Sequence, residues 1–572
     1  MVFAFPRRLL GLETEYALRY SGWGPRPGND QIYDALLRAV AHEVASEAGR
    51  DQPEKKQVFL QNGGAFNYEH SPERPYDGLV EGATPECTSP GQLLRYQKAQ
   101  DLLLIRTLPE ARKHLQEQGY GGEIGLLKNC RDAEGHTYGA QENYEVEVAE
   151  GLFLFLYRCG LVALFPFLLV HFLAFWLGTL LFLAVFLLAT LGLLVASMLI
   201  PAVRRLSFVK LFSSGDERTL NAALGRVQLW MAYVELWPVA FPFCWLLRRT
   251  AFRAVRRRAG AFLISRPLLS GAGSVAGDGR FVLCEKGPGI VQWMRGSLRR
   301  EARSVFDTGN LLKQTARLLG FRFSPFLHLF ERRQRLQLGL SDSNCAQVAE
   351  LLKVATTALV MDMVEAGCLE DAPRPRRPVA ALKTLIHDPT LRERVEMEDG
   401  RLMSGLEIQR FYLERARLFV AERRVEALET REVLELWEET LQALEAGDYD
   451  LLVGRLDWVT KRFLIEAALE ELPAGADRDA VAKTIDLRYH ELGAGYLAQM
   501  EREGLAPVLV EPEEVHRALY EPPEDSPAFY RGHLIRKHRH SPVPLKVGWT
   551  SAWIGGRVQG RVVDFRRPPE AP

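Results

Sequence analysis

Residues 11–18 read GLETEYAL and set the pattern from which the fold of this chain can be worked out. Apolar and polar side chains alternate along the stretch, which predicts a β-strand with one buried face and one polar face. Glu13 and Glu15 are two residues apart, so both carboxylates lie on the polar face. Paired carboxylates are the hard oxygen ligands that Mg²⁺ on nucleotide phosphates prefers. A solvated strand face is the alternative interpretation.

Further acidic residues follow in two segments rich in glycine and turns. NGGAFNYEH ends on Glu69 and His70, and LVEGATPEC contains Glu81 and Glu86. Carboxylates gathered on neighbouring strands repel one another unless a cation or hydrogen-bond donors offset their charge. The spacing therefore favours a cation site built from several short segments.

The chain on either side of one long apolar run predicts an α/β fold. Strands are expected at QVFLQNG (57–63), IGLLKN (124–129) and ENYEVEVA (142–149), and a turn-rich loop at 69–82. Helices are expected over 33–48, 92–118, 351–367 and 405–447, from apolar residues at helical spacing.

The long apolar run has no charged side chain from Cys159 to Val203. A single bilayer crossing takes about 20 residues, and this run is roughly twice as long. We therefore expect a transmembrane helical hairpin that turns near Gly178. A buried pair of core helices is the alternative.

Basic residues follow the run, at Arg204, Arg205 and Lys210, and basic flanks favour the cytoplasmic side of a membrane. A second apolar stretch, 227–247, contains Glu235 and two prolines, so an interfacial or re-entrant helix is expected there rather than a third span. If the parts before and after the insertion form one domain, the number of crossings must be even.

Composition excludes some classes of protein. Lysine and arginine number 72, as do aspartate and glutamate, and this zero net charge argues against nucleic acid as a partner. The seven cysteines include no CxxC pair, which argues against a disulfide framework or a zinc site.

Several blocks together resemble the family of Pup ligases and Pup deamidases. GLETEYAL resembles the family's opening G-[IT]-E-x-E-[YF]-G, and NGGAFNYEH and EGATPEC resemble the two blocks that follow it. LLKNCRDAEGHTYGAQENY, SDSNCAQVAELLKVATTALV and EPPEDSPAFYRGHLIRK match later blocks in the family's order. The similarity covers about 7–150 and 256–555.

The resemblance implies a fold and a chemistry. The fold is a curved, mainly antiparallel sheet flanked by helices, with a small C-terminal domain. ATP phosphorylates a carboxylate on a small disordered ubiquitin-like protein, and a target lysine then attacks the acyl phosphate. Mg²⁺ on the phosphates is implied as the second cofactor.

Five site residues follow from the aligned blocks. Glu13 and Glu81 match magnesium ligands, Glu69 matches the catalytic acid that serves as base, and Thr84 and Trp549 match nucleotide contacts. We therefore expect an ATP- and Mg²⁺-dependent isopeptide ligase.

Departures from the family pattern keep two alternatives open. Ala65, Asn67 and Gln141 replace a family arginine, tyrosine and histidine, and DTGNLLK (307–313) lacks the acids, arginine and histidine of the family's N-T-R-D-E-P-H block. One alternative is a deamidase or isopeptidase, although the short connection between Glu15 and the NGG turn favours the ligase form. The other is a degenerate, membrane-bound binder of the tag.

The expected organisation has four parts. Residues 1–151 and 256–469 form the two halves of the ligase-like domain, 152–255 the membrane insertion, and 470–572 the small C-terminal domain. We expect a multi-pass protein of the cell membrane with its catalytic domain in the cytoplasm.

Overall fold

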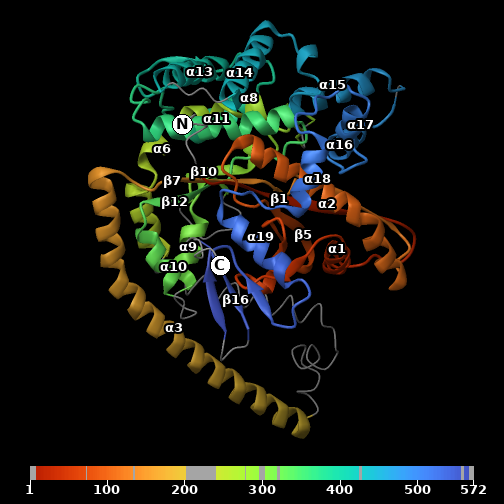
Figure 1. Ribbon diagram of the computed structural model, residues 1–572, viewed down its shortest axis with the longest axis vertical. Helices are drawn as coiled ribbons and strands as arrows, with labels where there is room; N and C mark the ends of the chain where they lie inside the picture. Colours follow the sequence, from red (N-terminus) through yellow and green to blue (C-terminus); the bar gives the residue numbers. More distant parts are fainter. Residues whose placement is uncertain are drawn as a thin grey trace.

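A large sheet forms the centre of the molecule in a computed structural model (Figure 1). The structure describes residues 8–565 except 72–73, 133–134, 201–239, 277–278, 296–302, 318–322, 424–427, 474 and 556–559. The sheet has ten strands in the order β10-β11-β12-β7-β1-β5-β4-β3-β2, and β6 also pairs with β1. Their bounds are β1 Leu10–Ser21, β2 Ser46–Ala48, β3 Val58–Leu60, β4 Ala65–Ser71, β5 Arg74–Ala83, β6 Glu123–Leu127, β7 Gln141–Glu147, β10 Ile290–Met294, β11 Arg303–Asp307 and β12 Arg333–Leu338.

The sheet is mainly antiparallel, since only the pair β10–β11 runs parallel among its described pairings. The predicted α/β fold with a large sheet flanked by helices is confirmed. Strand β1 alternates as expected: Leu10, Leu12 and Tyr16 are buried, whereas Glu13 and Glu15 are only partly covered.

The stretch 69–82 differs from its prediction as a loop. It lies within a β-hairpin, because β4 pairs with β5 from Ala65↔Ala83 to Glu69↔Leu79. Proline and glycine in this stretch suggested a loop, but Val80 and Tyr68 are buried against the helices, and their burial stabilises a strand conformation.

Helices cover the apolar face of the sheet. α1 (Asn29–Glu43) contacts β5, α2 (Pro90–Glu117) contacts β1, and α11 (Gln347–Glu365) contacts β7. The helix predicted to end at Gly367 is α11, and Gly367 has the positive φ of 75° that glycine adopts at low cost after a helix. The helix expected at 405–447 is two helices, α13 (Gly405–Glu422) and α14 (Leu428–Ala446).

Shorter elements complete the described chain. They are α6 Arg253–Arg258, α7 Gly260–Ser265, α8 Pro267–Ser270, β8 Ser274–Val275, β9 Phe281–Val282, α9 Gly309–Ala316, α10 Ser324–Leu327, α12 Pro378–Ile386, β13 Arg394–Glu396, β14 Leu402–Ser404, α15 Asp457–Glu470, α16 Arg478–Tyr489, α17 Tyr496–Arg502, α18 Pro512–Tyr520, α19 Pro527–His538, β15 Leu545–Val547, β16 Ser551–Ile554 and β17 Arg561–Asp564.

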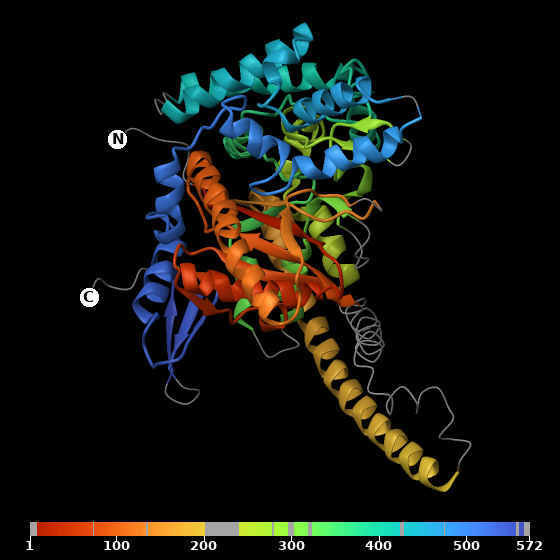
Figure 2. The ribbon, with the colours of Figure 1, turned by 90° about the vertical axis from the view of Figure 1, so that its right-hand side faces the viewer.

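The apolar run forms one continuous helix, α3 (Gly151–Leu199), rather than the predicted hairpin. The expected turn at Gly178 is wrong: a single interior glycine costs a helix only about 1 kcal/mol, and the neighbouring leucines and phenylalanines favour helix. α3 is the one helix in the described part of the chain that is long and apolar enough to cross a membrane. It extends away from the body (Figure 2).

Only Tyr157, Leu161 and Leu168 of α3 are buried, so its first turns pack on the body, whereas the side chains of 180–190 are exposed. The stretch 227–247 falls mostly outside the described residues. Its last part belongs to a helix over 240–250, where Phe243 and Leu247 are buried.

The C-terminal strands form a separate small sheet, β15-β16-β17, with a core of its own. Leu545, Val547 and Ala552 pack there against Phe59 and Ala65 from the large sheet. The predicted domain boundary at residue 470 stays a prediction.

Candidate functional site

One face of the large sheet carries a row of acidic and amide side chains. Glu15 stands opposite Glu81 across β1 and β5, and Glu81 stands opposite Asn67 across β5 and β4. Side chains of directly paired residues point to the same face, so these three groups form one row. Glu13 lies on the same face two residues before Glu15, as the alternation predicts.

Two carboxylates directly opposite each other destabilise a sheet unless other groups offset their charge. Asn67 donates through Nδ2 to Glu81 Oε1 at 2.7 Å. The Lys55 ammonium forms an ion pair with Glu69 and lies 4.0 Å from Glu81 Oε2. The ion-pair partner of Glu69 in the described chain is thus Lys55.

Burial raises the pKa of Glu81 to about 8. Lys55 opposes this shift, while the carboxylates of Glu69, Glu13 and Glu15 add to it. Burial, followed by the charge of Glu69, also raises the pKa of Glu15, although the backbone N–H of Gly139 donates to its carboxylate at 2.7 Å. The row therefore favours a bound proton or another cation near neutral pH.

One oxygen in this row has no donor. Asn67 Oδ1 is buried and lacks a hydrogen-bond partner among the residues that the structure describes. A buried oxygen beside a carboxylate whose pKa is raised is the donor set that a hard divalent cation accepts. The residues present therefore fit Mg²⁺.

Glu13 is held by residues from the far side of the insertion. Arg335 and Gln337 on β12 donate to its two carboxylate oxygens at 2.5 Å and 3.2 Å. Gln337 also donates to Gln141, which stands where the family has a histidine. The two halves of the sequence thus meet at Glu13.

The block 307–313 lies at the edge of the same face. Asp307 pairs with Gln337 across β11 and β12, and Arg295 bonds its carboxylate at 3.1 Å. The residues after Asp307 form α9, with Asp307 Oδ1 accepting from Gly309 N at 2.7 Å. An arginine–aspartate pair is therefore present there.

Thr84 directly follows Ala83, the β5 residue that pairs with Glu13, and Trp549 packs against Phe59 of β3. Thr84 is buried, and its hydroxyl accepts a hydrogen bond from Leu12 N at 3.0 Å. Trp549 is partly exposed and meets Phe59 edge-on, with ring centroids 5.1 Å apart. The roles of the five predicted site residues, Glu13, Glu69, Glu81, Thr84 and Trp549, stay predictions.

Arg531 is a functional candidate that the motif comparison did not single out. Its guanidinium lies 4.7 Å from the centre of the Trp549 ring, donates to the Trp549 carbonyl at 2.7 Å and forms an ion pair with Glu86. It also donates to the Gly63 carbonyl. The signal available in the sequence was its place in the family-like block EPPEDSPAFYRGHLIRK.

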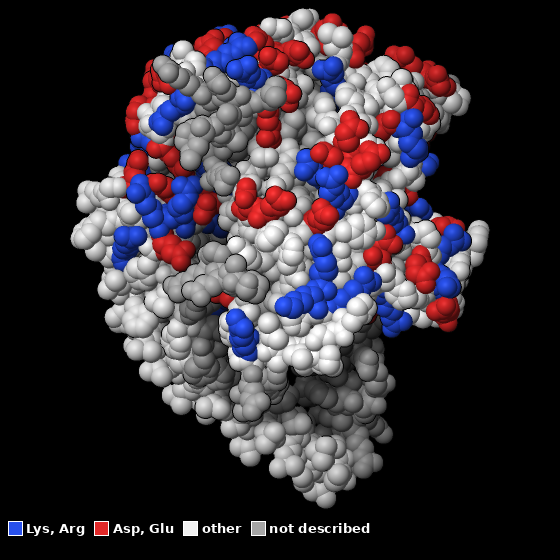
Figure 3. All heavy atoms as spheres, in the orientation of Figure 1, with Lys and Arg blue, Asp and Glu red and all other residues white. Residues whose placement is uncertain are grey.

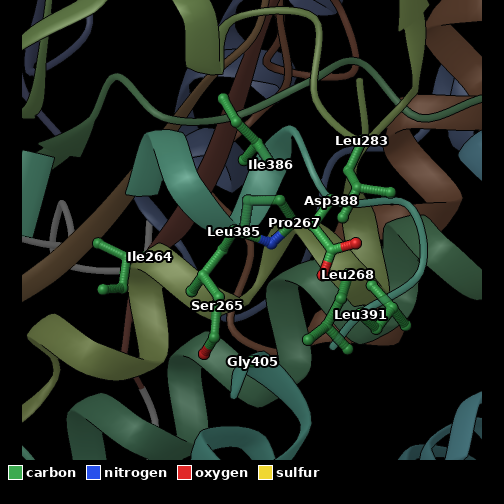
Figure 4. Close-up of a pocket in the computed structure, with 10 residues that line it drawn as sticks. All are labelled: Ile264, Ser265, Pro267, Leu268, Leu283, Leu385, Ile386, Asp388, Leu391 and Gly405. Atoms are coloured by element: carbon green, nitrogen blue, oxygen red, sulfur yellow. The ribbon is translucent and has the colours of Figure 1, made fainter. Parts of the chain in front are cut away.

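Two other features can be separated from the acidic row. Among the described residues, Glu285, Asp486 and His490 alone bring three possible metal ligands within 4.8 Å of one another, but the Lys461 ammonium lies among them, 2.7 Å from Asp486. An apolar pocket beside Leu268 encloses about 10 Å³, the room of one water molecule (Figure 4). Neither can hold a nucleotide.

The fold and site together define a class: a large, mainly antiparallel sheet with helices on its apolar face and a row of carboxylates on its polar face. The sequence profile described as Pup-ligase protein matches residues 8–553, and the chain belongs to that family. The resemblance seen in the sequence is confirmed, and the chain is a member of a ligase family.

Relatives of known sequence match nearly end to end. The Pup–protein ligase of Acidimicrobium ferrooxidans is 27% identical over 567 residues, which cover 98% of this chain and 96% of the relative. That of Kineococcus radiotolerans is also 27% identical and covers 97% and 95%.

Two solved structures share the fold. One is the complex of the prokaryotic ubiquitin-like protein Pup with its ligase PafA, with a TM-score of 0.66, 21% identity and coverage of 98% of this chain and 88% of that one. The other is PafA with ADP, with a TM-score of 0.61, 20% identity and coverage of 96% and 92%.

Proposed function

We propose that this protein is an ATP- and Mg²⁺-dependent ligase that attaches a small Pup-like protein to target lysines. The observation that carries the proposal is the acidic row on the polar sheet face, where Glu81 has a raised pKa beside an Asn67 oxygen that has no hydrogen-bond partner among the described residues. The names of its relatives, which are Pup–protein ligases, support ligation over deamidation.

The residues divide the work as follows. Glu13 and Glu81 would hold Mg²⁺, which when bound neutralises charge on the phosphates. Thr84 and Trp549 would contact the nucleotide. The PafA–ADP structure supports a nucleotide as substrate.

Two bond exchanges complete the reaction. The carboxylate of the tag attacks the γ-phosphorus of ATP, so a C–O–P link forms and ADP leaves. The target amine then attacks the acyl carbon, the C–N bond forms and phosphate departs. Glu69 takes the amine proton, because a lysine with a pKa of about 10.4 is protonated near pH 7 and must lose a proton to attack.

The partner is proposed to be a small disordered protein with a C-terminal carboxylate. The PafA complex with Pup supports this class of partner, since it shares the fold of this chain over most of both proteins. Target proteins supply the lysine.

We also propose that the protein is bound to a membrane through α3, with the catalytic domain in the cytoplasm. The helix carries exposed apolar side chains from Leu169 to Leu199, about 46 Å at 1.5 Å per residue. The hydrocarbon core of a bilayer is only about 30 Å thick. Figure 3 shows no charged side chains along this flank, and Arg248 and Arg249 lie exposed beside Trp245 near its base.

A metal-binding variant tests the ligase proposal. Glu13→Gln keeps the size and one acceptor oxygen but removes the charge, so Mg²⁺-dependent nucleotide binding in calorimetry should fall at least tenfold, about 1.4 kcal/mol. Glu432→Gln, on the exposed surface of α14, is the matched control. Unchanged binding by Glu13→Gln would overturn the assignment of this ligand.

A second candidate is a tag-binding protein without catalysis. The observation in its favour is that Arg335 already neutralises Glu13. Purified full-length protein with ATP, Mg²⁺ and a Pup-like protein distinguishes the two: ADP release supports the ligase, and tag binding without ADP release supports the binder.

A further inference from the structure

Lys55 is the one lysine among the described residues whose ammonium lies against the predicted base, Glu69. Lys55 ends a short 3₁₀ turn, Pro53–Lys55, that precedes β3. Its Nζ forms an ion pair with Glu69 and lies 4.0 Å from Glu81, and its side chain is 18% exposed. Burial opposes its charged form, but Glu81 and Glu69 hold the pKa of Lys55 above its usual range.

The backbone beside Lys55 is held in place by the contacts of the next residue, Lys56. Lys56 bonds both carboxylate oxygens of Asp34 at 2.7 Å, and its carbonyl accepts from the Tyr33 hydroxyl at 3.2 Å. Lys56 also takes up a left-handed φ of 48°, which is uncommon for a residue with a side chain. The turn therefore presents Lys55 at a fixed point, on a four-carbon stem with several rotatable bonds.

The chemistry of this contact matches one step of the proposed reaction. An acceptor lysine must bring its ammonium to Glu69, where it loses a proton before attack. A carboxylate pair that holds one lysine ammonium can hold another of the same charge and shape. The carboxylates of Glu69 and Glu81 can therefore recognise a lysine side chain, and Lys55 of the same chain already occupies that position.

We propose that Lys55 occupies the acceptor-amine subsite as an internal stand-in, so that a target lysine enters only by displacing it. This rests on the proposed function, because it gives Glu69 the role of base. Lys55 thereby favours acceptors whose lysine can compete with its own ammonium for Glu69. While no target is bound, Lys55 covers Glu69.

Replacement of Lys55 by methionine tests the competition. Lys55→Met keeps the length of the chain without its charge, so the KM for an Nα-acetyl-lysine amide acceptor should fall, by roughly tenfold. The amine KM is measured at saturating ATP and Mg²⁺, because Lys55 also lies 4.0 Å from Glu81, a proposed Mg²⁺ ligand. Lys113→Met, exposed on α2, is the control and should change none of these values.

Three results would overturn the inference. An unchanged KM for the amine with altered Mg²⁺ dependence would show that Lys55 stands in for the metal. A lower kcat with unchanged KM would place Lys55 in the chemistry itself. A rise in KM would show that Lys55 helps to hold the acceptor.

A binding measurement keeps the test independent of turnover. Titration of the acetyl-lysine amide into full-length protein without ATP should show about tenfold tighter binding to Lys55→Met than to the unmodified chain. If the protein hydrolyses no ATP but this difference appears, the proposed function fails and the subsite stands. If ATP is used and binding is equal, the subsite fails alone. Thermal unfolding verifies that the variant is folded.

Discussion

At the scale of single residues, Glu81 is the group whose surroundings change its chemistry most. It lies between Glu15 and Asn67 in the row, and its pKa is about 8 in the folded chain. The unfolded chain releases the same proton near pH 4.3. The native state therefore binds more protons across this window, and the free energy of unfolding falls as pH rises from about 4.5 through 8.

We expect Mg²⁺ binding to strengthen with pH over the same window. A carboxylate must be deprotonated before it binds metal, so the apparent affinity should rise about tenfold per pH unit between pH 6 and the pKa near 8. Calorimetric titration with Mg²⁺ and a non-hydrolysable ATP analogue at pH 6, 7 and 8 measures it.

The variant Glu81→Gln is the control for that titration. It should bind Mg²⁺ weakly at every pH and should also remove part of the loss of stability toward pH 8. A pH-independent affinity in the unmodified chain would mean that Glu81 is not a metal ligand.

Glu69 gives a second prediction at this scale. Glu69→Ala should preserve the fold and ATP binding but lose at least a hundredfold of amide-bond formation, the typical contribution of a general base. Glu69→Asp should retain part of the activity. Ligation of a fluorescent tag peptide measures the loss, with Glu117→Ala on the exposed end of α2 as control. Full activity of Glu69→Ala would assign the base elsewhere.

At the scale of secondary-structure elements, α3 is distinguished by the exposed apolar surface of its second half. Its first turns are fixed to the body: a side chain at Gly160 would collide with Leu246, and Phe165 meets Phe326 with centroids 5.8 Å apart. Beyond Leu168 no side chain of α3 is buried, and the apolar side chains of 180–188 are exposed. Such a surface is stable in water only if another apolar phase covers it.

Two arginines introduced into the exposed apolar part of α3 should prevent membrane binding. Arginine at the centre of a bilayer costs roughly 2.5–3.5 kcal/mol per residue, so Leu180→Arg with Leu187→Arg should cost about 5 kcal/mol or more. Both positions are exposed. Flotation of the protein with phosphatidylcholine–phosphatidylglycerol vesicles measures the effect.

The double alanine variant at the same positions is the control and should still float. If the unmodified chain does not float, or the double arginine variant does, α3 meets a protein rather than a bilayer. A reporter placed near residue 120 and another near 400 would test whether both halves face the cytoplasm.

At the scale of the whole molecule, Arg531 joins the C-terminal sheet to the large sheet. From α19 it reaches the Gly63 turn between β3 and β4, the Trp549 carbonyl and Glu86 after β5. The residues that it joins lie in distant parts of the sequence. The predicted nucleotide contact Trp549 therefore depends on an arginine for its place beside the sheet.

Removal of Arg531 should destabilise the contact between the C-terminal sheet and the large sheet. Breaking one partner of a buried ion pair typically costs 3–5 kcal/mol, so Arg531→Met should lower the free energy of unfolding by about 3 kcal/mol and weaken nucleotide binding. Urea unfolding and nucleotide titration measure the two effects. Lys537→Met, on the exposed face of α19, should change neither. If Arg531→Met is as stable as the unmodified chain and binds nucleotide normally, the position of Trp549 does not depend on Arg531.

The sequence by itself determined what depends on local periodicity and on ordered motifs. The alternation in residues 11–18 placed Glu13 and Glu15 on one strand face, and helical spacing predicted α2 and α11 within a few residues. The ordered blocks predicted the family, and the profile match over 8–553 confirmed it.

Only the tertiary structure decided what depends on register and burial between distant segments. It brought Lys55 to Glu69, and Arg335 from beyond the insertion to Glu13. Pairings of this kind are set by which strands lie side by side, and no spacing in the sequence encodes that. Likewise the raised pKa of Glu81 comes from burial beside other carboxylates. In α3, the length of the apolar run predicted a hairpin, whereas the backbone stays helical through Gly178 because no residue there forces a turn.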